Sequence, residues 1–423
     1  MYDQVAPRHE ACPPLEHVSV AGDSVLPYPE AWRDQITVDV IHDGAVLPDP
    51  YLVDARGRRL QERTWYRSFV HERDWGASLV AERIARRLCL GSFMRVTTAR
   101  CLLDFGRFPG STQPGATHLR RFAINTPFSQ LLGFPQKRRL LEEHYDVISS
   151  EMDRAIRGRL LKIAVHTYDR YNASGTERPQ VSLVTRALGY QLDSEMPVGV
   201  FDPLYPDILA EFTLDRILRD RISLTLEKAG TPVAHNYPYA LPEGSPEVRH
   251  QVWCFFDWLQ QRFEESEPGT VDDPAYAWVW ELLKDTNLRS PRAVALRSYL
   301  HMYRRPAAGR QTEYAAAERA YHHVTGFLHA DGGHMVRQYR LQPVRPMAFG
   351  IEVRKDLLWE FDEAGHPMRP APERGLEVAD RIADALLIYL NEDKPGSREP
   401  LNDGGPSPLR VSPGRAMASV RRS

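Results

Sequence analysis

The sequence is poor in cysteine, has no long apolar run and carries almost no net charge. Its 423 residues include four scattered cysteines without a CxxC pair, which excludes a paired-thiolate zinc site and a disulfide framework. No stretch approaches the roughly 18 apolar residues of a membrane-spanning helix. The formal charge of −2 argues against a broad nucleic-acid footprint, and the first residues lack the basic and apolar regions of a secretion signal. We therefore expect a cytoplasmic protein without nucleic-acid or membrane partners.

The rest of the composition is that of a globular protein in which strands alternate with helices. Hydrophobic residues make up 42% of the chain and charged residues 26%, as in ordinary soluble proteins. Short apolar runs predict strands at 35–41, 93–103, 160–165, 179–184, 233–239 and 347–354. Amphipathic patterns predict helices ending near 88 and spanning 138–158, 214–229 and 375–390. This alternation indicates an α/β fold with a mixed central sheet flanked by helices.

Changes in pattern divide the chain into four parts. Residues 1–34 are rich in proline and acidic residues and are expected to form an irregular lead-in. The α/β domain should comprise 35–245 and 335–393, and it is interrupted at 246–334 by an insertion with helical periodicity throughout. Residues 394–423 are crowded with Pro, Gly, Ser and Arg, and we expect a disordered tail.

Several candidate ligands follow predicted strands or precede helices. The apolar run 160–165 ends abruptly in His166, which is how a central strand of an α/β sheet presents a ligand or base, although a single histidine there is often structural. His42 follows the first predicted strand beside a glycine that permits a tight turn, and it could be a simple turn histidine. Glu72 and Asp74 lie at the start of a helix, where a carboxylate often only caps the helix.

Two arginines, Arg100 and Arg107, bracket Asp104 near the end of the second predicted strand. Their forked guanidinium groups can bind a substrate carboxylate while the aspartate holds one of them in place. A structural ion pair explains the same pattern, so the residues alone leave both interpretations open.

With Glu352, which lies in the last predicted strand, these residues have the composition of a mononuclear catalytic zinc site. Such a site takes three N or O side chains, leaves one position for water and uses a further carboxylate as base. Six short blocks along residues 36–358 add to this pattern. They are His42-Asp43-Gly44, Asp74-Trp75, Ala99-Arg100 through Asp104 to Arg107, His166-Thr167-Tyr168, Asn236-Tyr237-Pro238-Tyr239 and Ile351-Glu352-Val353-Arg354. In this order the blocks resemble those of the N-formylglutamate amidohydrolase family, relatives of the zinc carboxypeptidases.

The resemblance implies a zinc-carboxypeptidase-like fold and hydrolysis of an N-acyl amide bond in a small, carboxylate-bearing or peptide-like substrate. It implies one divalent metal ion, zinc, with His42, Asp74 and His166 as ligands and Glu72 as the alternative to Asp74. Glu352 matches the carboxylate that activates water at the metal. The positions that match substrate-binding residues are Arg100, Asp104, Arg107, Asn236 and Arg354.

The chain also departs from the family pattern. Gly106 stands where the family has an asparagine, and 145–149 reads YDVIS where the family's helix carries a histidine. Together with the helical insertion, these differences favour a larger acylated substrate than formylglutamate, such as a peptide or a biosynthetic intermediate. The insertion could form a lid over that substrate or contact another protein.

Other functions remain open. The same metal site could support non-hydrolytic chemistry in specialised metabolism, because two histidines and a carboxylate also suit non-haem iron. A non-catalytic binding module could use the insertion as its partner surface, although such a protein has little use for Glu352. The histidines near the end of the insertion could hold a separate metal ion, but adjacent histidines diverge on a helix, which favours a solvated face. They are His322, His323, His329 and His334.

Overall fold

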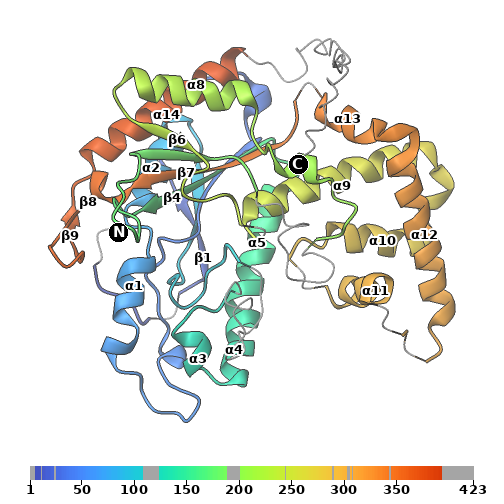
Figure 1. Ribbon diagram of the computed structural model, residues 1–423, viewed down its shortest axis with the longest axis horizontal. Coiled ribbons are helices and arrows are strands. Elements are labelled where there is room, and N and C mark those ends of the chain that lie inside the picture. The colour runs from blue at the N-terminus through green and yellow to red at the C-terminus, as the bar shows by residue number, and fades with distance from the viewer. Residues whose placement is uncertain are drawn as a thin grey trace, which may run out of the picture.

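The computed structural model describes residues 5–10, 12–22, 25–107, 123–187, 201–242, 244–287, 290–302, 305–306, 308–342 and 344–392. The tail expected at 394–423 lies outside the described residues. The chain forms a seven-stranded sheet covered by helices, with a group of further helices to one side (Figure 1). The α/β fold with a mixed central sheet flanked by helices is therefore confirmed.

The sheet combines parallel and antiparallel pairs in the order β1-β3-β2-β4-β7-β5-β6. Its strands are β1 (Leu15–Ser19), β2 (Ile36–Val40), β3 (Ser92–Val96), β4 (Leu161–Tyr168), β5 (Val181–Val184), β6 (Val233–His235) and β7 (Met347–Arg354). Strands β3, β2, β4 and β7 are parallel to one another, whereas β1 and β5 pair antiparallel with β3 and β7. The carboxyl ends of the four parallel strands therefore meet at one edge, where α/β sheets bind ligands.

Helices cover both faces of this sheet. The described α-helices outside the predicted insertion are α1 (Tyr66–Glu72), α2 (Ala77–Arg87), α3 (Phe128–Leu131), α4 (Phe134–Leu140), α5 (Asp146–Ile156), α7 (Asp207–Ala210), α8 (Arg216–Lys228) and α14 (Glu373–Glu392). A π-helical turn, Leu141–Tyr145, joins α4 to α5. Helices α2, α8 and α14 pack together on one face. On α2 the buried residues Val80, Ala81 and Ile84 form an apolar stripe, while Arg83 pairs with Asp380 of α14 at 2.7 Å.

The opposite face is covered by α5 and by the first helix of the predicted insertion. That region contains α9 (Pro246–Ser266), α10 (Pro274–Lys284), α11 (Pro291–Met302), α12 (Gln311–His329) and α13 (His334–Arg340). Helix α9 begins against the sheet, where Glu247 lies 2.7 Å from the buried ammonium group of Lys162 on β4. Helices α10 to α13 extend away from the sheet around a second hydrophobic core (Figure 1).

Two predicted boundaries differ from the structure. The helices of the insertion continue past residue 334 to the end of α13, and their core also takes in residues from before 246, including Phe201 and Tyr205. The lead-in 1–34, predicted to be irregular, contains β1. This edge strand is five residues long and buries Leu15 while its other residues remain partly or fully exposed, so its place depends on backbone pairing with β3 more than on an apolar pattern.

A short hairpin lies outside the seven-stranded sheet: β8 (Trp359–Phe361) and β9 (Pro367–Pro370) pair with each other after β7. All four cysteines are free thiols, of which Cys101 and Cys254 are buried. Over the described ranges, no helix has both the length and the apolar character needed to cross a membrane.

Candidate metal centre and substrate cavity

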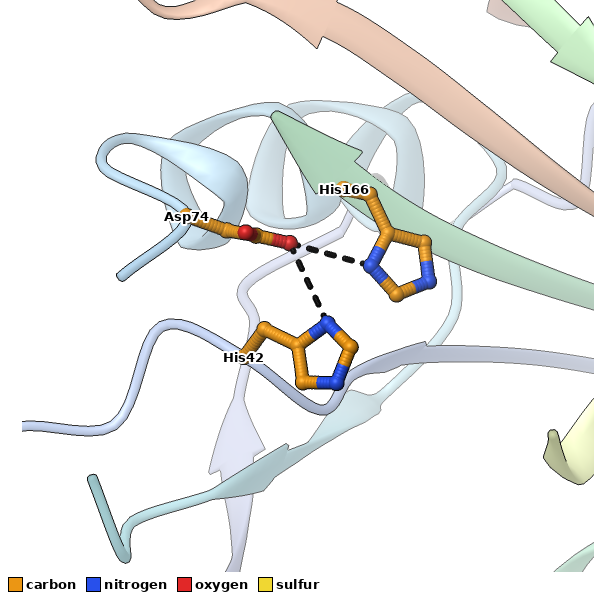
Figure 2. A group of neighbouring side chains, drawn as sticks. All are labelled: His42, Asp74 and His166. Atoms are coloured by element: carbon orange, nitrogen blue, oxygen red, sulfur yellow. Dashed lines mark hydrogen bonds and ion pairs between the residues drawn. The ribbon is translucent and has the colours of Figure 1, made fainter. Parts of the chain in front are cut away.

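Three side chains from distant parts of the chain meet at the carboxyl edge of the sheet: His42, Asp74 and His166 (Figure 2). The Oδ2 atom of Asp74 lies 3.0 Å from Nδ1 of His166 and 3.5 Å from Nδ1 of His42. One ligand atom from each residue lies within 4.8 Å of the other two. Among the described residues this is the one group of His, Cys, Asp and Glu side chains that converges in this way.

The backbone explains this convergence. His42 follows β2, and its carbonyl accepts a hydrogen bond from the Asp74 amide over 3.0 Å. Asp74 lies between α1 and α2, where Gly76 turns the chain with φ +85°, a conformation that favours glycine. A Cβ atom at Gly76 would also come within 2.7 Å of Leu358. His166 is near the end of β4, one strand from β2. The histidines therefore come from neighbouring parallel strands and the aspartate from the turn beside them.

Asp104 determines how the His42 ring is oriented. His42 Nε2 donates a hydrogen bond to Asp104 Oδ1 over 2.8 Å, so in the neutral ring the lone pair is on Nδ1. Nδ1 is buried without a hydrogen-bond partner among the described residues and faces Asp74. The amide of Gly106 donates to the same Asp104 oxygen over 3.0 Å. A carboxylate that orients the far nitrogen of a histidine is a common outer partner of a metal ligand.

The charges of the site are closely coupled. Burial would raise the pKa of the Asp74 carboxyl, but the hydrogen bond from His166 and the nearby His42 and Arg100 outweigh burial and lower this pKa well below its usual value. Burial alone would lower the pKa of His166, whereas the hydrogen bond with Asp74 and the charge of Glu352 raise it to about 9. Burial would also raise the pKa of Asp104, and the nearby Arg100 and His42 lower it.

The two predicted arginines lie beside this cluster with their charges already compensated. Arg100 Nη1 is 3.2 Å from Asp74 Oδ1, and its Nε is 3.4 Å from Asp104 Oδ2. Arg107 Nε is 3.0 Å from the same Asp104 oxygen. Nearby acidic groups, Asp104 first, raise the pKa of Arg100 although burial opposes this. The ion pairs with Asp104 agree with the structural interpretation of the two arginines. The side chains of Arg100 and Arg107 also remain 24% and 34% exposed, which agrees with the substrate-binding interpretation.

Glu352 lies opposite His166 in the parallel ladder of β4 and β7. Its Oε2 atom is buried and has no hydrogen-bond partner among the described residues. Burial raises the pKa of its carboxyl group to about 7, while the charge of His166 acts in the other direction. An unpaired carboxylate with a pKa near neutrality is suited to accept and release a proton.

These residues line a cavity of about 680 Å³, which is large enough for a small peptide-like molecule. Six carboxylates and four arginine or lysine side chains line it. The acidic residues are Glu72, Asp74, Asp104, Asp169, Glu247 and Glu352, and the basic residues are Arg100, Arg107, Arg178 and Lys355. Because negative groups outnumber positive ones, the cavity has the charge balance to receive a cation.

Three further predicted residues, Glu72, Asn236 and Arg354, lie apart from the cluster of His42, Asp74 and His166. Glu72, the alternative ligand, is 42% exposed and lies 3.7 Å from Arg100. The Asn236 side chain accepts hydrogen bonds from the backbone amides of Thr185 and Arg186, and it does not line the cavity. Arg354 also lies behind the cavity wall, where it pairs with Glu177 and Asp356.

The predicted histidine group at the end of the insertion does not gather into a metal cluster within the described residues. His323 bonds to Tyr276, His329 to the backbone of Thr325, and His334 to Gln338. These local contacts agree with the interpretation of a partly solvated helix face.

Two charged features of the site have no counterpart in the predictions. Lys162, fully buried in β4, lies 2.6 Å from Asp39 and 2.7 Å from Glu247, which reaches the cavity. A lysine inside an apolar strand is a usable signal, since lysine is almost never fully buried without a partner. Arg178, on a turn before β5, also lines the cavity. No sequence pattern distinguishes it from the other arginines of this arginine-rich chain.

No protein-family model matches the sequence, and comparison with curated proteins gives no match. Among solved structures, the chain is similar to an N-formylglutamate amidohydrolase from Ralstonia eutropha JMP134, with 13% sequence identity and a TM-score of 0.45, over 90% of this chain and 98% of that one. It is also similar to a gene product from Agrobacterium tumefaciens, with 14% identity and a TM-score of 0.37, over 84% and 88% of the two chains. The family that the sequence motifs suggest is thus represented among the similar structures.

Proposed function

We propose that this protein is a metal-dependent hydrolase of an N-acyl amide bond in a small carboxylate-bearing or peptide-like substrate. The observation that carries the proposal is the His42, Asp74 and His166 cluster, with the unpaired carboxylate of Glu352 one strand away in the same cavity. Three metal-binding side chains beside a free carboxylate are the parts that metal-assisted hydrolysis needs.

The donor set fits one divalent cation. Asp74 supplies a carboxylate oxygen, and His42 and His166 each direct Nδ1 to the same point. Asp104 occupies the other ring nitrogen of His42, which leaves Nδ1 for a metal ion. Two imidazoles and one carboxylate suit zinc, which would polarise the amide carbonyl and lower the pKa of water.

Glu352 is our candidate for the general base. Its carboxylate takes a proton from the attacking water as the new C–O bond forms at the carbonyl carbon. It then gives this proton to the amide nitrogen, the C–N bond breaks, and an acid and an amine are released. A pKa of about 7 suits both steps, since the group must gain and lose one proton in each cycle.

The arginines have separate roles in this proposal. Arg100, 3.2 Å from Asp74, is close enough to the metal ligands to stabilise negative charge that develops on the carbonyl oxygen. Arg107 is more exposed than Arg100 and lines the cavity, so we assign it to a carboxylate of the substrate.

The test is a screen of N-acyl amino acids and short peptides for amine release by the zinc-loaded protein, followed by Glu352→Gln on the best substrate. We expect turnover to fall by roughly 100-fold or more, because general base catalysis is lost while size and metal ligands are kept. Glu72→Gln is the matched control, since Glu72 lies at the cavity but outside the cluster. A Glu352→Gln enzyme with near-normal kcat would remove Glu352 as the base.

A further inference from the structure

Arg178 is distinguished from the other cations of the cavity by its lack of an acidic partner. Arg100 and Arg107 pair with Asp104, and Lys355 lies 3.0 Å from Asp169. Arg178 forms no ion pair with any described residue, and its Nε is buried without a hydrogen-bond partner among them. A partly buried cation without a counterion is unfavourable unless a ligand supplies the opposite charge.

Two tyrosine rings flank the Arg178 guanidinium. Its central carbon lies 5.3 Å from the centre of the Tyr168 ring and 5.5 Å from that of Tyr239, both cavity residues. Such contacts hold an arginine in place and partly offset its desolvation without neutralising its charge. The guanidinium therefore remains available to an anion in the cavity.

The turn that carries Arg178 is fixed by contacts from behind. Arg354 donates to the Arg178 carbonyl over 3.2 Å and pairs with Glu177 at 2.7 Å. The Tyr168 hydroxyl donates to the carbonyl of Pro179 over 2.7 Å, and the Arg178 amide donates to the carbonyl of Arg170 over 2.8 Å. Arg354 therefore supports the cavity wall through its bond to the Arg178 carbonyl. Together these hydrogen bonds fix the backbone position of Arg178.

The strand order places Arg178 and Arg107 on opposite sides of the reacting groups. Arg107 lies 3.0 Å from Asp104, which bonds to His42 after β2, on one side of β4 and β7, the strands that carry His166 and Glu352. Arg178 precedes β5, on the other side of β7, and Val181 at the start of β5 pairs with Val353 near the carboxyl end of β7. A substrate whose amide lies at His166 and Glu352 therefore extends toward a cation in both directions.

We propose that Arg178, held between Tyr168 and Tyr239, is a second anion subsite, and that the substrates carry a carboxylate on each side of the scissile amide. This inference rests on the proposed amide hydrolysis for the position of the reacting bond. It narrows the substrate class from N-acyl amino acids in general to those whose acyl group is itself acidic.

A matched pair of substrates tests this subsite. N-succinylglutamate and N-butyrylglutamate have acyl groups of similar length, and only the succinyl group ends in a carboxylate. We expect the zinc-loaded protein to prefer the succinyl compound in kcat/KM by on the order of 10- to 100-fold, as a charged hydrogen bond implies. In Arg178→Gln this preference should disappear, because kcat/KM falls more for the succinyl compound, which loses its charged partner, than for the butyryl compound. Arg170→Gln, on the same turn but outside the cavity, should keep the preference.

A binding measurement separates this proposal from the hydrolytic one. In Glu352→Gln protein, calorimetry should show tighter binding of N-succinylglutamate than of N-butyrylglutamate, and adding Arg178→Gln should abolish the difference. Equal discrimination with and without Arg178 overturns the subsite, even if the protein hydrolyses both compounds. Discrimination that depends on Arg178, in a protein that releases no amine from either compound, supports the subsite and contradicts the proposed hydrolysis.

Discussion

Asp104→Asn should weaken metal binding without removing any proposed ligand. In the native protein the buried Asp104 carboxylate accepts the His42 Nε2–H bond over 2.8 Å. Asparagine can still accept this bond, but it carries no charge and also leaves Arg100 and Arg107 without a shared counterion. Both changes disfavour a cation at the neighbouring cluster. Loss of such an outer partner typically lowers metal affinity by about 10- to 100-fold, or roughly 1.4 to 2.7 kcal/mol.

The assay is the equilibrium Kd for zinc, measured by competition with a chromophoric chelator at fixed pH. Asp169→Asn is the matched control, because Asp169 is another carboxylate of the cavity but pairs with Lys355 and lies outside the cluster. We expect its Kd to equal that of the native protein. An Asp104→Asn Kd equal to that of the control would refute the view that Asp104 prepares His42 for a metal ion.

The ionisable groups lead to three further predictions, two on pH dependence and one on the buried Lys162. Because the pKa of His166 is raised to about 9 in the metal-free protein, a bound zinc ion must displace its proton, and zinc affinity should rise by about tenfold per pH unit up to pH 9. The raised pKa of His166 also stabilises the metal-free fold. This stabilisation is complete below the usual histidine pKa, near 6.5, and is lost as the pH rises to about 9, so the free energy of unfolding should decrease over this interval. Lys162→Met leaves the carboxylates of Asp39 and Glu247 buried without their cation, and urea unfolding should show a loss on the order of 3–5 kcal/mol, against no comparable loss in the exposed Lys228→Met. A pH-independent zinc affinity, or Lys162→Met as stable as its control, would contradict these assignments.

The central strands were predictable because local sequence and tertiary environment agree there. Strand β7 has the predicted bounds, and β4 continues the predicted run 160–165 through His166. Both are apolar runs covered on both faces, and such strands give a continuous hydrophobic signal. His42 and His166 of the predicted cluster converge for the same reason, since residues at the carboxyl ends of neighbouring parallel strands share one edge, and Asp74 joins them from the turn between α1 and α2.

The remaining features depend on contacts between distant residues. Asp104 lies 62 positions from His42, and its sequence neighbours suggested a role with two arginines but not its bond to the histidine ring. The Arg178 site depends on which cations of the cavity have acidic partners, and this cannot be read from composition. Strand β1 was missed because a five-residue edge strand with one buried residue has too little apolar pattern to be detected.

The most direct test of the account is the metal content of the purified protein, measured by inductively coupled plasma mass spectrometry after exposure to zinc and removal of excess ion. The cluster predicts close to one ion per chain in the native protein, and a nearly empty site in His166→Ala with its circular dichroism spectrum unchanged. Full zinc occupancy in His166→Ala, or no bound divalent metal in the native protein, would contradict a metal centre at His42, Asp74 and His166.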